Sequence, residues 1–581
     1  MLSPPRRPRS HRTLRRRIPI GTTALGVALG SAVLATNTAH AGGFEVPDTG
    51  ARAAGRGGAM VAGADDLTAL HYNPGALARQ RGTSFLYNQN LVFHRATFER
   101  APLTADVWGV DQDFEPVRDR RKVFPLGLFA VVASDFGLRN WTFAAGIYGP
   151  SAVGRHDYPQ YGPQSFQLTQ MDVLMAYYNV AAAWKLRDVF GIGVTIQYVD
   201  MLQMKYSLIV DSRAVTALNP TPEATGTQLE TQLNLKDRTA ATALVGLWYR
   251  PHQRIELGLA SRVIPIFLRP SGGVTVDKPE LVTDAIHVTM PLVLPATLRG
   301  GVRYIHDVGA PGKSRKWFDI ELDVVYENWS SIDSFDLDIS GEISGQPLSN
   351  LTIDKKWKDT VSVRLGGDIF ALPPYLTVRA GGYFESPTQD PEYAHLDFPA
   401  FLRGAVGAGL TAGAKGIYGT VGYMHVFQKT QAVSEVQAQV FQQRPIAPCP
   451  DRCDGLSGVP ANAGTFTSSF DLLNFGIEVR FAELLAGRRA KRAKGKSTAP
   501  SGPAQPPTPA PTERTPARQP SAAPPSSAPE SSDEPGSSEP GSSEPESSEP
   551  GSSEAGSSAP ESNPPESDVR AAPEPTDLDV G

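Results

Sequence analysis

Long stretches of this chain alternate between apolar and polar residues, and this period of two constrains the fold more than any other feature. In FDIELDVVY (318–326) the acidic residues Asp319, Glu321 and Asp323 stand between apolar ones. The same alternation runs through FGIGVTIQY (190–198), VSVRLGGDI (361–369) and LLNFGIEVRF (472–481). Because successive side chains of a strand point to opposite faces, each stretch predicts a strand with one apolar and one polar face. A soluble β-sandwich would also alternate, so the pattern alone leaves the environment open.

The number and spacing of these stretches help to distinguish a soluble β-sandwich from a membrane β-barrel. About fourteen segments begin near residues 84, 124, 141, 171, 190, 232, 253, 287, 316, 354, 375, 401, 416 and 463. Long connections, such as 99–123 and 429–462, alternate with short ones such as GLRN, RDV and PHQ. An even number of antiparallel strands with short turns at one end and long loops at the other is typical of outer-membrane barrels, which must close in lipid. We predict an all-β fold, a transmembrane antiparallel β-barrel of about 14 strands over residues 83–481.

The two ends of the chain have a different composition. An arginine-rich start, an apolar stretch over 18–35 and the triplet Ala39-His40-Ala41 are typical of a secretory signal peptide over residues 1–41; the alternative is a membrane anchor. Residues 482–581 are first basic and then rich in Pro, Ser and Glu, with little apolar surface to bury. We therefore expect a disordered tail in the periplasm and a protein of the bacterial outer membrane.

Other composition and motif signals exclude several functions. The net charge of −5 gives no reason to expect a nucleic-acid partner. The glycine-rich stretch GARAAGRGG lacks the Gly-Lys-Ser/Thr of a phosphate loop, and the histidines show no metal-ligand spacing. We expect no enzyme activity, no cofactor and no metal. Cys449 and Cys453 predict a small loop disulfide, as is usual in an exported protein; a metal site is the alternative.

Residues 42–82 precede the first strand and do not alternate. They are small, polar and rich in Gly and Ala, so they are compact enough to enter a barrel lumen as a plug. Near their end stands Asn73-Pro74-Gly75. Pro74 fixes one dihedral angle and Asn73 can bond its own backbone, which predicts a turn leading from the plug into the first strand.

The N-terminal motifs resemble those of the FadL/TodX family of outer-membrane transporters. Gly43-Phe44, Glu45, Gly55-Arg56, Ala64-Asp65 and Asn73-Pro74-Gly75 follow one another in the family's order. Later matches are YENWSSI (326–332), RLGGDI (364–369), RAGGYFESPTQDP (379–391) and VGYMHVF (421–427). The resemblance spans about residues 42–481, with Gly75 where the family has Ala; the tail has no counterpart.

This resemblance implies a barrel whose N-terminal segment, residues 42–82, forms a hatch in the lumen. It also implies passive transport of long-chain fatty acids or related hydrophobic compounds, which leave sideways through the barrel wall. Asp65, Asn73, Pro74 and Gly75 would belong to the hatch. The family's third strand kinks, and this chain has Tyr148, Gly149 and Pro150 there. Because proline cannot donate to a strand ladder, we expect the lateral opening at this point; the alternative is that these residues only end the strand.

A fatty-acid carboxylate requires a cation that faces the lumen. Arg364 and Arg379 lie on the polar faces of adjacent predicted strands, and Phe44 of the hatch would contact the apolar tail. Arginine suits bidentate carboxylate recognition, but structural pairing with Asp or Glu is an alternative role for either one.

Two other functions remain open at this point: a porin-like channel for small polar solutes, and a surface-binding or adhesion barrel. The expected partners are a hydrophobic small molecule such as a fatty acid, outer-membrane lipid and lipopolysaccharide, and the barrel assembly machinery. We expect a monomer.

Overall fold

A computed structural model describes residues 49–108, 111–120, 124–149, 155–211, 228–310, 314–445 and 460–486. All of them belong to one compact unit, Met1–Pro500. The predicted signal peptide, Phe44, Pro150, Cys449, Cys453 and the predicted tail beyond residue 486 lie outside the described residues. No described helix is long and apolar enough to cross a membrane.

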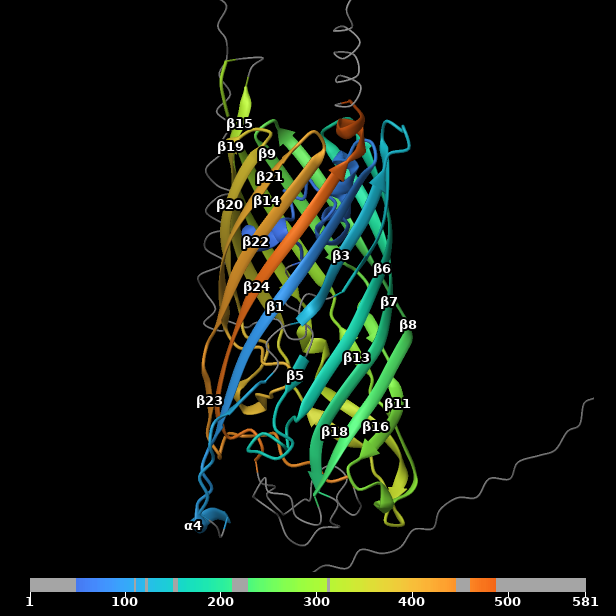
Figure 1. Ribbon diagram of the computed structural model, residues 1–581, viewed down its shortest axis with the longest axis vertical. Coiled ribbons are helices and arrows are strands. Elements are labelled where there is room, and N and C mark those ends of the chain that lie inside the picture. Colours follow the sequence, from blue (N-terminus) through green and yellow to red (C-terminus); the bar gives the residue numbers. More distant parts are fainter. Residues whose placement is uncertain are drawn as a thin grey trace, which may run out of the picture. The chain divides into compact units, whose positions relative to one another are not determined.

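Fourteen antiparallel strands close into a barrel, as the alternation predicts (Figure 1). They are β1 (Ser84–Arg100), β3 (Phe124–Ser134), β4 (Trp141–Tyr148), β6 (Gln170–Leu186), β7 (Phe190–Asp211), β8 (Gln228–His252), β9 (Ile255–Arg262), β14 (Thr297–Val308), β15 (Arg315–Glu327), β19 (Thr360–Leu372), β20 (Leu376–Glu385), β21 (Arg403–Ala414), β22 (Ile417–Gln428) and β24 (Gly464–Arg480). Each pairs with the next in this order. Pairing of β24 with β1, from Ser84↔Arg480 to Arg100↔Gly464, completes the ring.

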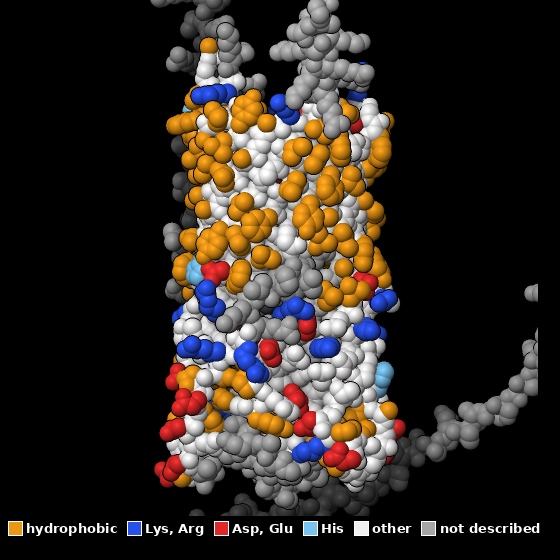
Figure 2. All heavy atoms as spheres, viewed as in Figure 1, with side chains coloured by type: hydrophobic (Ala, Val, Ile, Leu, Met, Phe, Trp, Pro, Cys, Tyr) orange, Lys and Arg blue, Asp and Glu red, His pale blue; other side chains and the backbone are white. Residues whose placement is uncertain are grey.

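Around the N-terminal segment 49–82, the barrel carries polar side chains inside and apolar ones outside. Along β15, Asp319, Glu321 and Asp323 are buried, whereas the alternate residues Ile320 and Leu322 are about half exposed, at 45% and 49%. Figure 2 shows hydrophobic side chains over the half of the barrel nearer the short turns and charged ones over the half nearer the long connections. An outward apolar band is what a lipid-facing barrel requires.

Short strands and helices in the long connections build a second layer at the loop end. The strands are β2 (Val117–Arg118), β5 (Arg155–Asp157), β10 (Ile266–Leu268), β11 (Ser271–Val276), β12 (Val282–Thr289), β13 (Leu292–Leu294), β16 (Ser334–Ile343), β17 (Gln346–Pro347), β18 (Leu351–Asp354) and β23 (Gln431–Val433). The helices are α4 (Ala105–Trp108), η2 (Pro279–Leu281), η3 (Trp329–Ser331) and η4 (Pro391–Tyr393). β11 extends the sheet from β8, and β12, β16 and β18 follow it.

Three boundaries differ from the sequence predictions. The tenth barrel strand, predicted near residue 354, begins at Thr360, because residue 354 ends the loop-end strand β18. The eighth barrel strand, predicted near residue 287, begins at Thr297; residue 287 belongs to β12, which also alternates because Ile286 and Val288 face an apolar cluster of the loop end. Residues 481–486 are helical, although 482–486 fall in the predicted disordered tail. Glu483 of this helix accepts a hydrogen bond from Tyr418 and pairs with Arg480 at 3.6 Å.

The loop end holds the main apolar core. Five of the eight methionines are buried there: Met171, Met175, Met201, Met204 and Met290. Aromatic residues join them, notably Trp329, Phe335, Trp357, Phe398 and Phe401. A cavity of about 50 Å³ remains among the apolar side chains beneath β16 and β18.

Candidate functional site

The N-terminal segment 49–82, called the plug segment from here on, lies inside the ring of strands. Its helix α2 (Ala51–Gly55) packs against β20, β21, β22, β24 and β1, and its helix η1 (Pro74–Arg79) packs against β4, β6, β7, β8 and β9. A third helix, α3 (Ala69–Tyr72), precedes η1. Because these contacts come from opposite sides of the barrel, the segment fills the lumen nearer the short-turn end (Figure 1).

Small residues allow this close fit. Gly57 has φ +60°, and a Cβ there would lie 2.5 Å from the Cα of Gly382 in β20. A Cβ on Gly75 would lie 2.6 Å from the carbonyl oxygen of Gly246 in β8. Glycine at 75 therefore lets η1 rest directly on the wall backbone.

Arg56 ties the plug segment to the barrel wall. The side chain is fully buried, and its guanidinium lies 2.8 Å from Asp319, 2.7 Å from Glu321 and 3.1 Å from Asp368. Its Nε donates to the carbonyl of Ala59 at 2.9 Å. Five donors in a planar fork suit this arrangement of carboxylates on β15 and β19.

Backbone groups of the plug segment bind the same acidic face. The N–H groups of Met60 and Val61 donate to Asp323 Oδ2 at 2.7 and 2.9 Å. The N–H groups of Ala62 and Gly63 donate to Glu321 Oε1 at 2.7 and 2.8 Å. The alternation of β15 predicts an acidic inner face, but not that a loop far away in the sequence would satisfy it.

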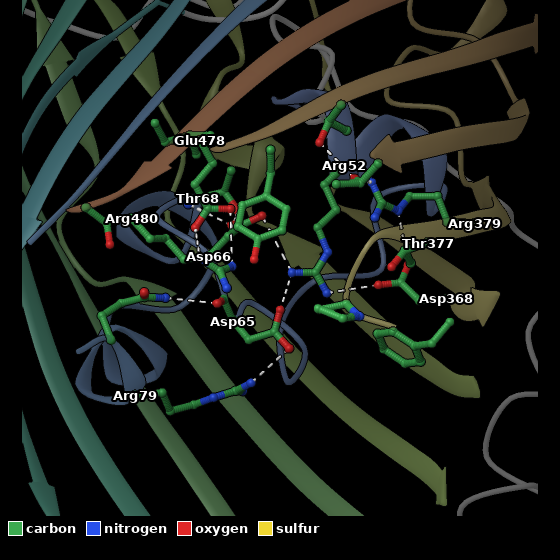
Figure 3. A pocket seen from close by; sticks show the side chains of 18 of the residues that line it. Arg52, Asp65, Asp66, Thr68, Arg79, Asp368, Thr377, Arg379, Glu478 and Arg480 are labelled. Atoms are coloured by element: carbon green, nitrogen blue, oxygen red, sulfur yellow. Dashed lines mark hydrogen bonds and ion pairs between the residues drawn. The ribbon is translucent and has the colours of Figure 1, made fainter. Parts of the chain in front are cut away.

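Asp65, predicted as a hatch residue, is a second residue that joins the plug segment to the barrel wall. Its carboxylate pairs with Arg52 and Arg79 of the plug segment and with Arg303 of β14, the last two at 3.2 and 3.0 Å. Figure 3 shows Arg52 and Arg79 directed at Asp65 from either side. The site thus combines charges from both the plug segment and the wall.

The predicted turn at Asn73-Pro74-Gly75 is the start of η1. Asn73 Oδ1 accepts from the N–H of Gly75 at 3.0 Å, which is the local backbone bond expected from the sequence, and Pro74 occupies the first helical turn. The Asn73 amide also donates to the carbonyls of Val61 and Leu247, at 2.8 and 2.9 Å. One side chain therefore joins two parts of the plug segment and strand β8.

A cavity of about 630 Å³ lies between the plug segment and the wall at the short-turn end. Charged residues dominate its lining, among them Arg52, Asp65, Asp368, Arg379 and Arg480 (Figure 3). An apolar molecule would find little favourable contact there.

The structure does not bring Arg364 and Arg379 together. In the register of β19 with β20, Arg364 stands opposite Tyr383 and Arg379 opposite Asp368. Arg379 pairs with Asp368 at 3.1 Å and donates to Thr411 at 2.8 Å, which fits the structural alternative named above. Arg364 lies over the Tyr383 ring and 3.7 Å from Glu385.

Arg364 instead belongs to a layer of charged side chains on the loop side of the plug segment. We call it the arginine layer; its members, whose charges interact with one another, are Arg262, Arg299, Glu327, Arg364, Glu385 and Arg403. Its four arginines are buried, and they outnumber its two carboxylates. Arg299 Nη1 lies 3.4 Å from Nε2 of His71 in the plug segment, and Glu327 accepts from the indole of Trp329 in the apolar core. Arg299 and Arg262 were not predicted as part of a site, because alternation does not reveal which charges meet across the lumen.

Strand β4 ends, among the described residues, next to the point where the sequence predicts an opening. β4 pairs with β6 up to Tyr148↔Tyr177, and β5 resumes at Arg155↔Asp172. Residues 173–176 of β6 therefore have no strand partner on this side among the described residues. Gly149 still donates to Leu128 of β3 at 3.3 Å, while Pro150 lies outside the described residues.

Tyr148 faces the lumen and is 2% exposed. Its ring stacks on Phe129 at 5.1 Å and meets the edges of Tyr177 and His71 at 5.3 and 5.2 Å. Its hydroxyl lies 3.1 Å from His71 Nδ1 and accepts from Gln197. An aromatic cluster thus joins the plug segment to the end of β4.

Comparison with known proteins agrees with this architecture. Residues 32–448 match the model of the family described as outer membrane protein transport protein (OMPP1/FadL/TodX). A FadL homologue from Pseudomonas aeruginosa has a similar fold, with a TM-score of 0.59, 14% identity, and coverage of 76% of this chain and all of that one. The toluene transporter TodX of P. putida gives 0.52, 12% identity, and coverage of 75% and 98%. A search of curated protein sequences finds no match.

The family match spans well over half of the chain and confirms the resemblance predicted from the N-terminal motifs. This chain belongs to the OMPP1/FadL/TodX family and is a transport protein of the outer membrane rather than an enzyme.

Proposed function

We propose that the protein carries long-chain fatty acids or related hydrophobic compounds passively across the outer membrane. The long connections face the cell exterior and the short turns face the periplasm, as in other outer-membrane barrels. The plug segment acts as the hatch, and the ligand leaves sideways beside Tyr148. One observation carries the proposal: a continuous apolar cluster runs from the loop end to the plug segment and reaches Tyr148 at the end of β4.

The apolar interior supplies an adaptable path. The cavity of about 50 Å³ has room for only one or two water molecules, so an entering alkyl chain must displace side chains. Methionine has three rotatable bonds and no branching, and it repacks at small cost. The five buried methionines of the loop end therefore support passage of apolar molecules of varied shape.

Energetics favour a lateral exit over an axial one. Each methylene group loses about 0.8 kcal/mol when it moves from apolar surroundings into water. An alkyl chain that placed five methylenes in the charged cavity at the short-turn end would lose roughly 4 kcal/mol. Leaving between β4 and β6 into lipid avoids this cost, because the apolar chain passes directly into hydrocarbon.

The arginine layer supports recognition of a carboxylate. A fatty acid that enters from the loop end would meet this layer before it meets the plug segment, and the four arginines of the layer are buried. Arg299 is the member that contacts the plug segment, through His71. We assign the carboxylate to the arginine layer rather than to Arg379, whose guanidinium is held by Asp368 and Thr411.

Uptake by cells that lack their own fatty-acid carrier tests the proposal. We would compare labelled oleate with labelled toluene in cells expressing the unmodified protein, the protein without residues 42–48, Arg299→Gln, or none. We expect uptake of oleate to depend on residues 42–48, and Arg299→Gln to reduce uptake of oleate but not of uncharged toluene.

Each alternative predicts a different result. Negligible uptake of both compounds, with a folded barrel in the membrane, would contradict hydrophobic transport. Steady ion conductance across a planar bilayer would then favour a porin-like channel. Binding of ligand to whole cells without uptake would favour a surface-binding barrel.

A further inference from the structure

Three metal-binding side chains that are distant in sequence meet at the loop end, outside the pathway described above. They are His94 of β1, Asp119 of the connection after β2, and His156 of β5. Asp119 Oδ2 lies 2.8 Å from His156 Nδ1 and 3.6 Å from His94 Nδ1, and all three ligand atoms lie within 4.8 Å of one another. Within the described part of the chain, this is the one group of three such residues close enough to hold an ion.

We propose that His94, Asp119 and His156 bind a divalent transition-metal ion of the zinc class. Two imidazole nitrogens and one carboxylate oxygen suit Zn²⁺, Co²⁺ or Ni²⁺, whereas Ca²⁺ and Mg²⁺ prefer sets made only of oxygen. Three protein ligands leave a fourth position for water or another small ligand.

The distances fit such an ion. Zinc–ligand lengths of about 2.0–2.1 Å place neighbouring ligand atoms of a tetrahedron about 3.4 Å apart. The separations of 2.8 and 3.6 Å lie on either side of this value. The third separation, between the two imidazole nitrogens, is at most 4.8 Å, so the two rings would approach each other as the ion enters.

The surroundings hold the ligands in orientation. His94 Nε2 lies 3.0 Å from the hydroxyl of Ser468, so its Nδ1 is the nitrogen directed at Asp119. The His94 ring also stacks on Phe470, with ring centres 4.3 Å apart. The other carboxylate oxygen, Asp119 Oδ1, accepts from the N–H of Asp157 at 3.1 Å. In zinc sites, the second nitrogen or oxygen of a metal-binding side chain, which does not contact the metal, commonly makes such a hydrogen bond. These hydrogen bonds raise the affinity of the site for zinc.

The backbone around the site is also fixed. The N–H of Asp119 donates to the carbonyl of Ala96 in β1 at 3.0 Å, and the N–H of Arg120 donates to Asp157 at 2.8 Å. The three metal-binding side chains are therefore preorganised by β1, β5 and the connection between these strands. Little chain ordering would oppose metal binding, whereas an ion held there would join the three pieces more firmly.

Another histidine–aspartate pair provides a matched control. His425 Nδ1 lies 2.6 Å from Asp471 on the neighbouring strand, but no third metal-binding side chain joins this pair among the described residues. A histidine–aspartate hydrogen bond is thus common to both places, and the second imidazole distinguishes the proposed site.

Metal titration of the purified full chain tests the proposal, with a tag that contains no histidine. We expect one Co²⁺ per chain with a visible absorption spectrum, which Zn²⁺ displaces. His94→Asn and His156→Asn should each weaken binding at least tenfold, and Ser468→Ala should weaken it less; His425→Asn should leave it unchanged. The same titration with Cys449→Ser/Cys453→Ser separates this site from any thiolate site.

Thermal unfolding provides a second readout. An ion that binds only the folded state raises the unfolding midpoint. We expect Zn²⁺ to raise the midpoint of the unmodified protein and of His425→Asn, but not of His156→Asn. Absence of Co²⁺ and Zn²⁺ binding to the unmodified chain would overturn the proposal, and so would binding that persists in both His94→Asn and His156→Asn.

Discussion

Replacement of Arg56 by methionine should loosen the plug segment without unfolding the barrel. The guanidinium of Arg56 is fully buried and lies within 3.1 Å of three carboxylates. Removing one partner of a buried ion pair costs about 3–5 kcal/mol, because the remaining charge is left without compensation. Methionine keeps most of the side-chain length, so the loss comes mainly from charge and hydrogen bonding.

Loss of the Arg56 ion pairs should lower the free energy needed to open the plug segment locally, while the barrel stays folded. A decrease of about 4 kcal/mol in the free energy of opening raises the open population roughly 10³-fold, since each 1.4 kcal/mol is a factor of ten. Amide hydrogen exchange followed by mass spectrometry measures this directly, because protection of buried amides reports the free energy of local opening. Peptides covering residues 51–63 should exchange up to about 10³-fold faster, while those of the wall strands should change little.

Two further variants make the test decisive. Arg81→Met changes the same residue type in the same segment, but the Arg81 side chain is 47% exposed and its ion pair with Asp188 is 4.0 Å long, so exchange should change less than threefold. Glu321→Gln in the Arg56→Met background removes one uncompensated charge and should restore part of the protection. Equal exchange of residues 51–63 in Arg56→Met, Arg81→Met and the unmodified protein would refute the view that buried ion pairs hold the plug segment.

Three other outcomes follow from the structure. Gly57→Ala forces φ +60° on a residue with a Cβ directed at Gly382, so it should displace the plug segment and raise single-channel conductance in planar bilayers; unchanged conductance would contradict this close packing. Tyr148→Phe removes the hydroxyl that contacts His71, and faster exchange of the peptide containing His71 would verify the contact. Burial opposes ionisation of Asp397, but nearby His395 and Lys355 outweigh it and hold the pKa of Asp397 below the usual 3.8. A carboxylate with a depressed pKa contributes stability that is complete above its unfolded pKa and is lost as the pH falls toward its folded pKa. The unfolding temperature, followed by tryptophan fluorescence, should therefore decrease as the pH falls below about 4, and this decrease should be smaller in Asp397→Asn.

Much of the barrel can be predicted from the sequence because alternation reports which side chains face the lumen. Asp319, Glu321 and Asp323 occupy the inner face of β15, as their spacing indicates. The order of the strands around the barrel can also be predicted from the sequence, because short turns join neighbouring strands. The prediction near residue 287 was wrong because alternation identifies any strand with one apolar face, and it does not distinguish a barrel strand from a strand of the loop-end sheet.

The interior could not be predicted to the same depth. The contact of Arg56 with Asp319 joins residues 263 positions apart, and no periodic pattern links the plug segment to a particular wall strand. The same applies to His94, Asp119 and His156, whose sequence spacing gives no metal motif. Contacts across a lumen depend on barrel curvature and strand stagger, which a one-dimensional pattern does not contain.

The contacts on the loop side of the plug segment connect the place where the ligand arrives with Tyr148 at the end of β4. Arg299 lies against Nε2 of His71, and Nδ1 of the same ring lies against Tyr148 at the end of β4. A carboxylate that pairs with Arg299 would compete with its contact to His71, because one guanidinium edge cannot serve both at full strength. The imidazole would then be free to move away from Tyr148, and the aromatic cluster at the end of β4 would lose one of its contacts. An uncharged ligand cannot compete with His71 for Arg299. Under the proposed function we therefore expect uptake of fatty acids to depend on His71 more strongly than uptake of aromatic hydrocarbons does.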